Sequence, residues 1–261
     1  MTSETDNSHN ASPQTMVFLD LDDTIFQTLR KNPQGIHPAT GTSFMTEAQR
    51  CFFDILLSAA DVMVVPVTAR DATQYGRTFL SGHPRITVSA LYYCGLITTH
   101  GLRDNRWHNH MESLYRLLTP SIRDTYERVA RLINSSSFKL YNVDDYYVTL
   151  KHTNTSDGNY IEMLQGLVQK LAYVVEGGGY NIYHNDNNVS LVPTFLDKKH
   201  AIDYLVQRYQ PRLTIGVGDG LSDLGFMTRC DYGIFPGRSQ IGRLLVGQSS
   251  LDISGSCEQP T

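Results

Sequence analysis

Hydrophobic positions near the start of the chain form short, unbroken runs, and polar residues follow each run. Residues 16–19 (MVFL) end at Asp20, and residues 61–67 (DVMVVPV) end at Thr68. Such runs are typical of strands that are buried on both faces of a parallel sheet. Between them, residues 46–59 place apolar residues at helical spacing. The order strand, helix, strand predicts a βαβ unit.

The same alternation returns near the end of the chain. We predict a helix over residues 198–209, a strand over 213–217, a short helix over 221–228 and a strand over 232–235. Helices that alternate with buried strands favour an α/β fold built on a Rossmann-like parallel sheet.

The middle of the chain has a different pattern. The predicted elements are a hairpin over residues 90–102, a helix over 111–133, strands over 138–140 and 146–151, a helix over 160–174, and strands over 180–184 and 189–192. This αββαββ order predicts an antiparallel sheet with helices on one face. We therefore predict an inserted α+β cap domain over residues 109–189, a discontinuous catalytic core over 16–108 and 190–247, and disordered tails over 1–15 and 248–261.

Composition narrows the classes of function. Hydrophobic residues make up 41% and charged residues 18% of the chain, which supports a folded protein. A net charge of −4 gives no reason to expect nucleic acid or a membrane surface as partner. The four cysteines have no metal-ligand spacing, and the sequence has neither a membrane-spanning stretch nor a hydrophobic signal core. We expect a cytoplasmic protein.

Chemically informative residues follow the predicted strands or begin a predicted helix. Ligands of open parallel sheets bind at the carboxyl ends of the strands, so these positions are candidates for one site. They are Asp20 and Asp22 in DLDDT, Thr68, Ala69 and Arg70 in VTAR, Lys198, and Asp219 and Asp223 in GDGLSD.

Carboxylates that lie close together repel one another unless a cation lies among them, and oxygen-only ligands favour Mg²⁺. In phosphoryl transfer, Asp20 could attack phosphorus, while Asp22 could protonate the leaving oxygen and then activate water. We expect Asp219 to bind the metal directly, and Asp223 to bind it through water or to orient Lys198.

Hydrogen-bond donors and a fixed positive charge are also predicted at this site. The Thr68 hydroxyl and the backbone N–H groups of the turn at Ala69 and Arg70 suit phosphate oxygens. Lys198 would balance the negative charges of Asp20 and the phosphoryl group. The adjacent Lys199 is an alternative for that role.

DLDDT, VTAR, Lys198 and GDGLSD, in this order, resemble the four motifs of the haloacid dehalogenase-like phosphatases over about 140 core residues. The αββαββ insertion is similar to the second cap type of that superfamily, in the branch of sucrose-phosphate phosphatase and the Cof-like sugar phosphatases. The resemblance implies a sugar phosphate as substrate class, and metal ligation by Asp20 and by the backbone carbonyl of Asp22. Asp23 and Ala69 depart from glycines that are common at those places in the family.

Some roles stay open at this point. Asp23 could simply cap a turn, and the cap tyrosines could either bind sugar or pack a core. The tyrosines concerned are Tyr141, Tyr146, Tyr147, Tyr180 and Tyr183, with Lys151, His152 and Asn185 as similar candidates.

These observations predict a Mg²⁺-dependent phosphomonoesterase that hydrolyses a small phosphorylated metabolite through an aspartyl phosphate on Asp20. A phosphotransferase or phosphomutase would use the same residues. A non-catalytic binding protein is a further alternative, although such a protein would be expected to have lost the nucleophile or the acid.

Overall fold

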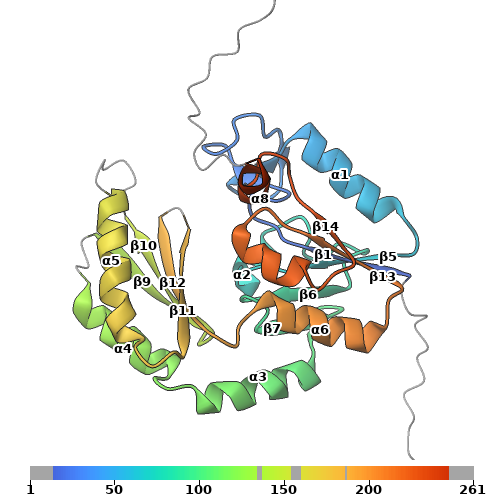
Figure 1. The fold of residues 1–261 in the computed structure, drawn as a ribbon. Coiled ribbons are helices and arrows are strands. Elements are labelled where there is room, and N and C mark those ends of the chain that lie inside the picture. Colours follow the sequence, from blue (N-terminus) through green and yellow to red (C-terminus); the bar gives the residue numbers. More distant parts are fainter. Residues whose placement is uncertain (1–13, 134–136, 154–159, 186, 247–261) are drawn as a thin grey trace, which may run out of the picture. The chain divides into compact units, whose positions relative to one another are not determined.

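The structure, a computed structural model, describes residues 14–133, 137–153, 160–185 and 187–246 (Figure 1). The chain divides into two compact units, residues 1–66 with 202–261 and residues 67–201. The second unit is larger than the predicted cap, whose limits at residues 109 and 189 stay a prediction. Except for Gln14 and Thr15, the predicted tails lie outside the described residues.

The first unit contains a parallel sheet of four strands in the order β14-β13-β1-β5. Its strands are β1 (Thr15–Leu19), β5 (Val62–Pro66), β13 (Leu213–Val217) and β14 (Tyr232–Ile234). β1 pairs in parallel with β13 on one side and with β5 on the other. Phe18 and Leu19 in β1 are fully buried, as expected for a central strand. The predicted α/β core with a parallel sheet is confirmed.

The helices of the first unit follow local signals in the sequence. The helix α1 (Glu47–Ser58) begins after Thr46, whose side chain forms a capping box with Gln49. The predicted helix over 221–228 is a 3-10 turn, η1 (Leu221–Asp223), followed by α7 (Leu224–Met227). The structure adds α8 (Gln240–Leu245) and a small sheet of β2 (Gln27–Thr28), β3 (His37–Pro38) and β4 (Ser43–Met45). The helix α6 (Lys198–Tyr209) spans the boundary between the two units.

The second unit contains an antiparallel sheet in the order β11-β12-β10-β9. The strands are β9 (Phe138–Val143), β10 (Tyr147–His152), β11 (Tyr180–Asn185) and β12 (Asn188–Pro193). The helices α4 (Ile122–Leu132) and α5 (Tyr160–Val174) lie on one face of this sheet (Figure 1). Their apolar residues form a core with every second residue of the strands, including Val148, Leu150, Val189 and Leu191.

The second unit also contains the sheet of β6 (Val88–Leu91), β7 (Leu96–Thr99) and β8 (Leu102–Arg103), together with α2 (Ala72–Gly76) and α3 (Asn105–Leu117). The prediction of a single helix over residues 111–133 was wrong, because α3 and α4 are separate helices. Pro120 lies between them, and proline cannot donate the backbone hydrogen bond that a continuous helix requires. The Ser121 side chain then caps α4 by accepting from Asp124 N.

None of the helices in the described ranges is both long enough and apolar enough to span a bilayer.

Candidate active site

Three carboxylates of the first unit lie together at the ends of two neighbouring parallel strands. Asp20 follows β1 directly, and Asp219 and Asp223 follow β13. The backbone N–H of Asp20 donates to Val217 O at 2.9 Å, which holds the end of β1 against the end of β13. One carboxylate oxygen from each of Asp20, Asp219 and Asp223 lies within 4.8 Å of the others.

This group carries concentrated negative charge in a largely buried place. Asp20 is 7% exposed and Asp223 is 3% exposed. Two like charges at about 4 Å repel by about 1 kcal/mol in water and by about 4 kcal/mol at the effective dielectric of a protein surface. A cation among the three would remove that cost, and an all-oxygen donor set fits a hard divalent ion such as Mg²⁺.

The Thr24 hydroxyl joins two of these carboxylates. Its Oγ1 lies 2.9 Å from Asp20 Oδ2 and 3.3 Å from Asp219 Oδ1, so one proton is shared between two acceptors. A tight turn, in which Ile25 N donates to Leu21 O at 3.1 Å, carries the chain back so that Thr24 reaches Asp20. Thr24 is the last residue of the DLDDT motif, but spacing in the sequence alone does not show where its hydroxyl points.

The loop after β13 brings Asp223 close to its own backbone. The backbone N–H of Gly220 donates to Asp223 Oδ2 at 3.0 Å. A Cβ atom at Gly218 would lie 2.6 Å from Asp223 Cβ and 2.8 Å from its Oδ2, closer than such atoms pack. A glycine at position 218 is therefore what allows this carboxylate to lie where it does.

Asp22 and Asp23 have different surroundings from Asp20. The Asp22 side chain is exposed and lies outside the group of three carboxylates. Asp23 has a φ of 64°, a left-handed conformation that glycine and aspartate tolerate better than most residues. Its carboxylate pairs with Lys31 at 2.5 Å. These observations explain how aspartate can replace a glycine there, and they favour the turn-forming interpretation of Asp23.

The segment of residues 68–70 belongs to the second unit. Thr68 is 1% exposed, and its backbone N–H donates to Ala90 O at 2.9 Å. The Thr68 hydroxyl oxygen accepts from Arg70 N at 3.2 Å. Two further bonds hold the segment, from Tyr93 N to Thr68 O at 3.1 Å and from Tyr92 N to Arg70 O at 2.9 Å.

The two candidate lysines lie at the start of α6. Lys198 is the first residue of the helix, where its motif predicted it. The ammonium of Lys199 pairs with Asp197 at 2.8 Å, and its backbone N–H also donates to that carboxylate. Lys199 thus neutralises a carboxylate of its own, and the role of Lys198 toward the phosphoryl group stays a prediction.

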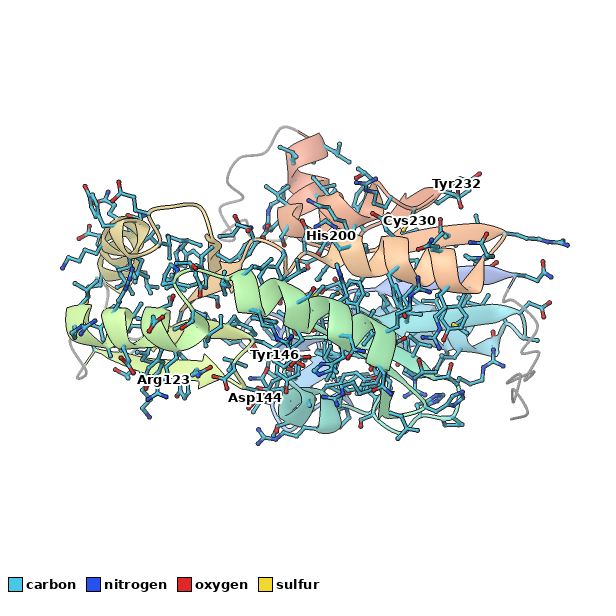
Figure 2. The ribbon with its side chains drawn as sticks, turned by 90° about the horizontal axis from the view of Figure 1, so that it is seen from below. Arg123, Asp144, Tyr146, His200, Cys230 and Tyr232 are labelled. Carbon is cyan, nitrogen blue, oxygen red and sulfur yellow. The ribbon has the colours of Figure 1, made fainter. Side chains whose placement is uncertain are left out.

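A tyrosine-rich turn holds residues 68–70 within the second unit. Tyr92, Tyr93 and Cys94 all have positive φ, between 54° and 69°. The Tyr92 ring stacks on Tyr146 with centroids 4.1 Å apart, and the Tyr92 hydroxyl donates to Asp144 Oδ2 at 2.6 Å. Asp144 and Tyr146 lie near each other in Figure 2. Burial and, to a smaller extent, the bond to Asp144 raise the pKa of Tyr92 far above its ordinary value.

The other four candidate tyrosines, which lie on β9, β10 and β11, differ in their contacts. The Tyr147 hydroxyl donates to Ala69 O at 3.1 Å, and burial raises the pKa of that hydroxyl strongly. Tyr180 donates to Pro120 O at 2.8 Å and belongs to the core under the helices, which is the packing role. Tyr183 stacks on Tyr93 at 5.6 Å, whereas Tyr141 is 44% exposed.

Solved structures with a similar fold include a sucrose-phosphatase from Synechocystis sp. PCC6803 in complex with sucrose and phosphate. The TM-score is 0.58 at 14% identity, over 90% of this chain and 88% of that chain. A haloacid dehalogenase-like hydrolase protein from Bacillus subtilis has a TM-score of 0.50 at 13% identity, over 90% and 86% of the two chains. This chain has the haloacid dehalogenase-like fold.

The C-terminal domain of trehalose-6-phosphate phosphatase from C. albicans is also similar in structure, with a TM-score of 0.54 at 13% identity over 83% of this chain and 74% of that chain. No family model and no curated protein sequence matches the chain. The fold that the four motifs implied is confirmed by structure, at an identity too low for a sequence match to reveal it.

Proposed function

We propose that the protein is a Mg²⁺-dependent phosphomonoesterase that hydrolyses a small phosphorylated metabolite. The observation that carries the proposal is the group of three carboxylates around Asp20 at the ends of β1 and β13. A buried anion with two carboxylate neighbours suits a nucleophile whose charge a cation offsets. The haloacid dehalogenase-like fold supports the same reaction class.

Asp20 would attack the phosphorus atom, so that an Asp20 Oδ–P bond forms as the ester P–O bond breaks. Asp22 would donate a proton to the departing alcohol oxygen; its side chain is exposed and lies outside the group of three carboxylates. Asp22 would then take a proton from the water that hydrolyses the aspartyl phosphate, releasing inorganic phosphate and restoring the Asp20 carboxylate.

Mg²⁺, held by Asp20, Asp219, Asp223 and the backbone carbonyl of Asp22, would neutralise negative charge on the phosphoryl oxygens. The Thr24 hydroxyl would keep Asp20 and Asp219 oriented. We further propose that Thr68 and the backbone N–H groups of Ala69 and Arg70 bind phosphoryl oxygens. Lys198 would supply the fixed positive charge.

A sugar phosphate is the proposed substrate class. The similar structures include one described as a sucrose-phosphatase and one described as a trehalose-6-phosphate phosphatase. The predicted cap would shield the reaction from water and select the leaving group.

The test is phosphate release from a panel of sugar phosphates, nucleotides and an aryl phosphate, with magnesium or with a chelator. We expect magnesium-dependent release that Asp20→Asn abolishes without a change in the circular dichroism spectrum. Asp23→Asn is the matched control and should keep its activity, because asparagine also tolerates a positive φ. Full activity of Asp20→Asn would refute the nucleophile assignment, and phosphate transfer to an added alcohol without net hydrolysis would establish the phosphotransferase alternative.

A further inference from the structure

The face of the antiparallel sheet opposite α4 and α5 has a distinct chemistry. Side chains of a strand alternate between faces, and paired residues of neighbouring strands share a face. One face of the sheet packs against α4 and α5. We call the opposite face, formed by the alternating strand residues, the polar face. Strand register arranges them in three rows. The first contains Lys139, Lys151 and Asn188, and the second contains Tyr141, Thr149, Ser190 and Tyr183. The third consists of two pairs, Val143 with Tyr147 and Val192 with Asn181.

The first row places two positive charges opposite each other. Lys151 pairs directly with Lys139 on β9 and with Asn188 on β12. Like charges that face each other across strands destabilise a sheet. Within the ranges that the structure describes, neither ammonium has a carboxylate partner. An anion between the two lysines would convert this repulsion into attraction.

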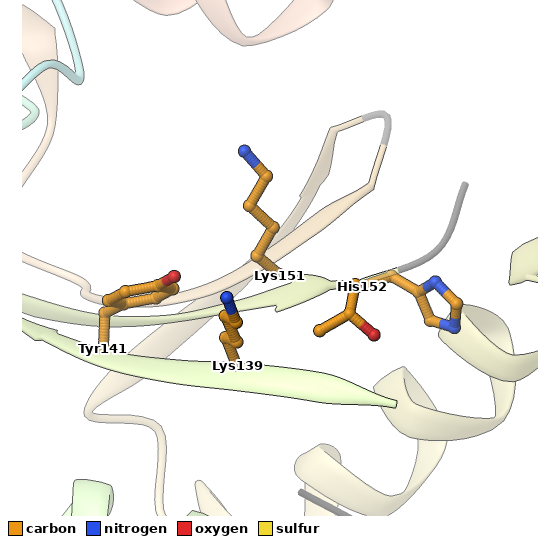
Figure 3. Close-up of a pocket in the computed structure, with 5 residues that line it drawn as sticks. Lys139, Tyr141, Lys151 and His152 are labelled. Carbon is orange, nitrogen blue, oxygen red and sulfur yellow. The ribbon is translucent and has the colours of Figure 1, made fainter. Parts of the chain in front are cut away.

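A pocket lies at the same place. It has a volume of about 210 Å³ and is lined by Lys139, Tyr141, Lys151, His152 and Thr153. Figure 3 shows the side chains of Lys139 and Lys151 extending to the same side of β9 and β10. Pockets for whole small ligands measure roughly 300–1,000 Å³, so this volume suits one polar group rather than an entire substrate.

The other two rows connect the lysines to the proposed phosphoryl-binding segment. In the middle row, the hydroxyls of Thr149 and Ser190 lie 2.9 Å apart, and the row suits a hydroxylated ligand. In the third row, Tyr147 donates to Ala69 O at 3.1 Å. Lys151 is four residues from Tyr147 on β10, a separation of roughly 13 Å along a strand.

We propose that Lys139 and Lys151 bind an anionic group, a phosphate or a carboxylate. The favoured source is the substrate itself, which would then be an elongated, hydroxylated phosphomonoester whose second anionic group lies near Lys151, roughly 13 Å along β10 from Tyr147. This part of the inference rests on the proposed function. The same lysines could instead bind a separate anion, and the experiment distinguishes the two sources.

The first arm measures binding by calorimetry in the Asp20→Asn protein, so that no turnover is needed. The probes are trehalose 6-phosphate and trehalose 6,6′-bisphosphate, which differ in a second anionic group. We expect the bisphosphate to bind roughly tenfold tighter or more, as charge-assisted hydrogen bonds to lysine would provide. Lys139→Gln with Lys151→Gln should remove this preference. Lys170→Gln, an exposed lysine on α5, should leave it unchanged.

The second arm compares the melting temperature of the protein in sulfate and in chloride at equal ionic strength. A sulfate-specific rise that the double variant loses, without any preference for the bisphosphate, assigns the lysines to a separate anion. If neither the preference nor the rise depends on the two lysines, the proposal is wrong. Absence of phosphatase activity in the wild type would refute the proposed function alone, because lysine-dependent binding is measured independently.

Discussion

The hydroxyl of Thr24 contacts two of the three carboxylates through a single proton. Its distances of 2.9 Å to Asp20 and 3.3 Å to Asp219 place it where it can set the direction of both side chains. Residues that orient a metal ligand or a nucleophile commonly change metal affinity or activity by about 10–100-fold when they are removed.

Thr24→Val keeps the shape of the side chain and removes this hydroxyl. We expect phosphate release to fall by about 10–100-fold, with a higher magnesium concentration needed for half-maximal rate. Magnesium titrations of the initial rate measure both effects, and Thr24→Ser should restore most of the loss. An unchanged magnesium requirement in Thr24→Val would show that the hydroxyl does not organise the carboxylates.

At the scale of elements, Asp231 fixes the start of β13. Its Oδ2 accepts from both the N–H and the hydroxyl of Thr214 at 2.8 Å, and its own N–H donates back to that hydroxyl at 2.9 Å. These bonds lower the pKa of Asp231 below its ordinary value of 3.8, and the bond from the Thr214 hydroxyl has the largest effect. A lowered folded-state pKa stabilises the fold above the ordinary value, and the contribution is lost as pH falls through the folded value.

Asp231→Asn keeps the shape and removes the charge. We expect the variant to unfold at a lower urea concentration than the wild type at pH 7. The difference between the two proteins should shrink as the pH is lowered below about 4, because the wild-type carboxylate then becomes neutral as well. Urea unfolding at pH 7 and at pH 3 gives the comparison, and an equal difference at both values would exclude a contribution from the charge.

Long or fully apolar elements were predictable from the sequence, whereas short and register-dependent features were not. The strands β1 and β5 follow from apolar runs that are typical of strands buried on both faces, and β13 follows from its β-branched residues. Strands of two or three residues, such as β2 and β3, are too short for any periodicity to show. The separation of α3 from α4 was signalled by Pro120, but the helical spacing continued past it and outweighed that signal.

In the candidate site, too, some features were predictable from the sequence and others were not. Asp20, Asp219 and Asp223 were predictable as a group, because strand order and parallel pairing bring strand ends together. The contacts of Thr24 and the opposition of Lys139 and Lys151 depend on turn geometry and strand register, which spacing in one sequence does not determine.

At the scale of the whole molecule, the motif residues are distributed over both units. Asp20, Asp22, Asp219 and Asp223 belong to the first unit, while residues 67–201 include the Thr68 segment and Lys198. The three carboxylates that would hold magnesium therefore come from one unit alone, and from two segments almost 200 positions apart in the sequence. A cation bound there would link Asp20, near the start of the chain, to Asp219 and Asp223, which lie much later in the sequence.

Magnesium should therefore stabilise the fold by mass action. A ligand that binds only the folded state, at a concentration of about a hundredfold its Kd, adds about 2.7 kcal/mol to the free energy of unfolding. We expect magnesium chloride to raise the melting temperature of the wild type relative to sodium chloride at equal ionic strength. Asp219→Asn should lose this rise and Asp23→Asn should keep it. Calorimetry gives the measurement, and a rise retained by Asp219→Asn would contradict the assignment of the metal site.

The turn formed by Tyr92, Tyr93 and Cys94 has a consequence for how the sequence can change. A left-handed conformation costs a residue other than glycine about 1 kcal/mol or more, and three such residues follow one another here. Glycine would remove that cost but would also delete the rings that stack on Tyr146 and Tyr183. Substitutions in the turn of residues 92–94, at Tyr146 and at Tyr183 are thus energetically coupled. A homologue that lost one of these rings would be expected to have changed the others as well.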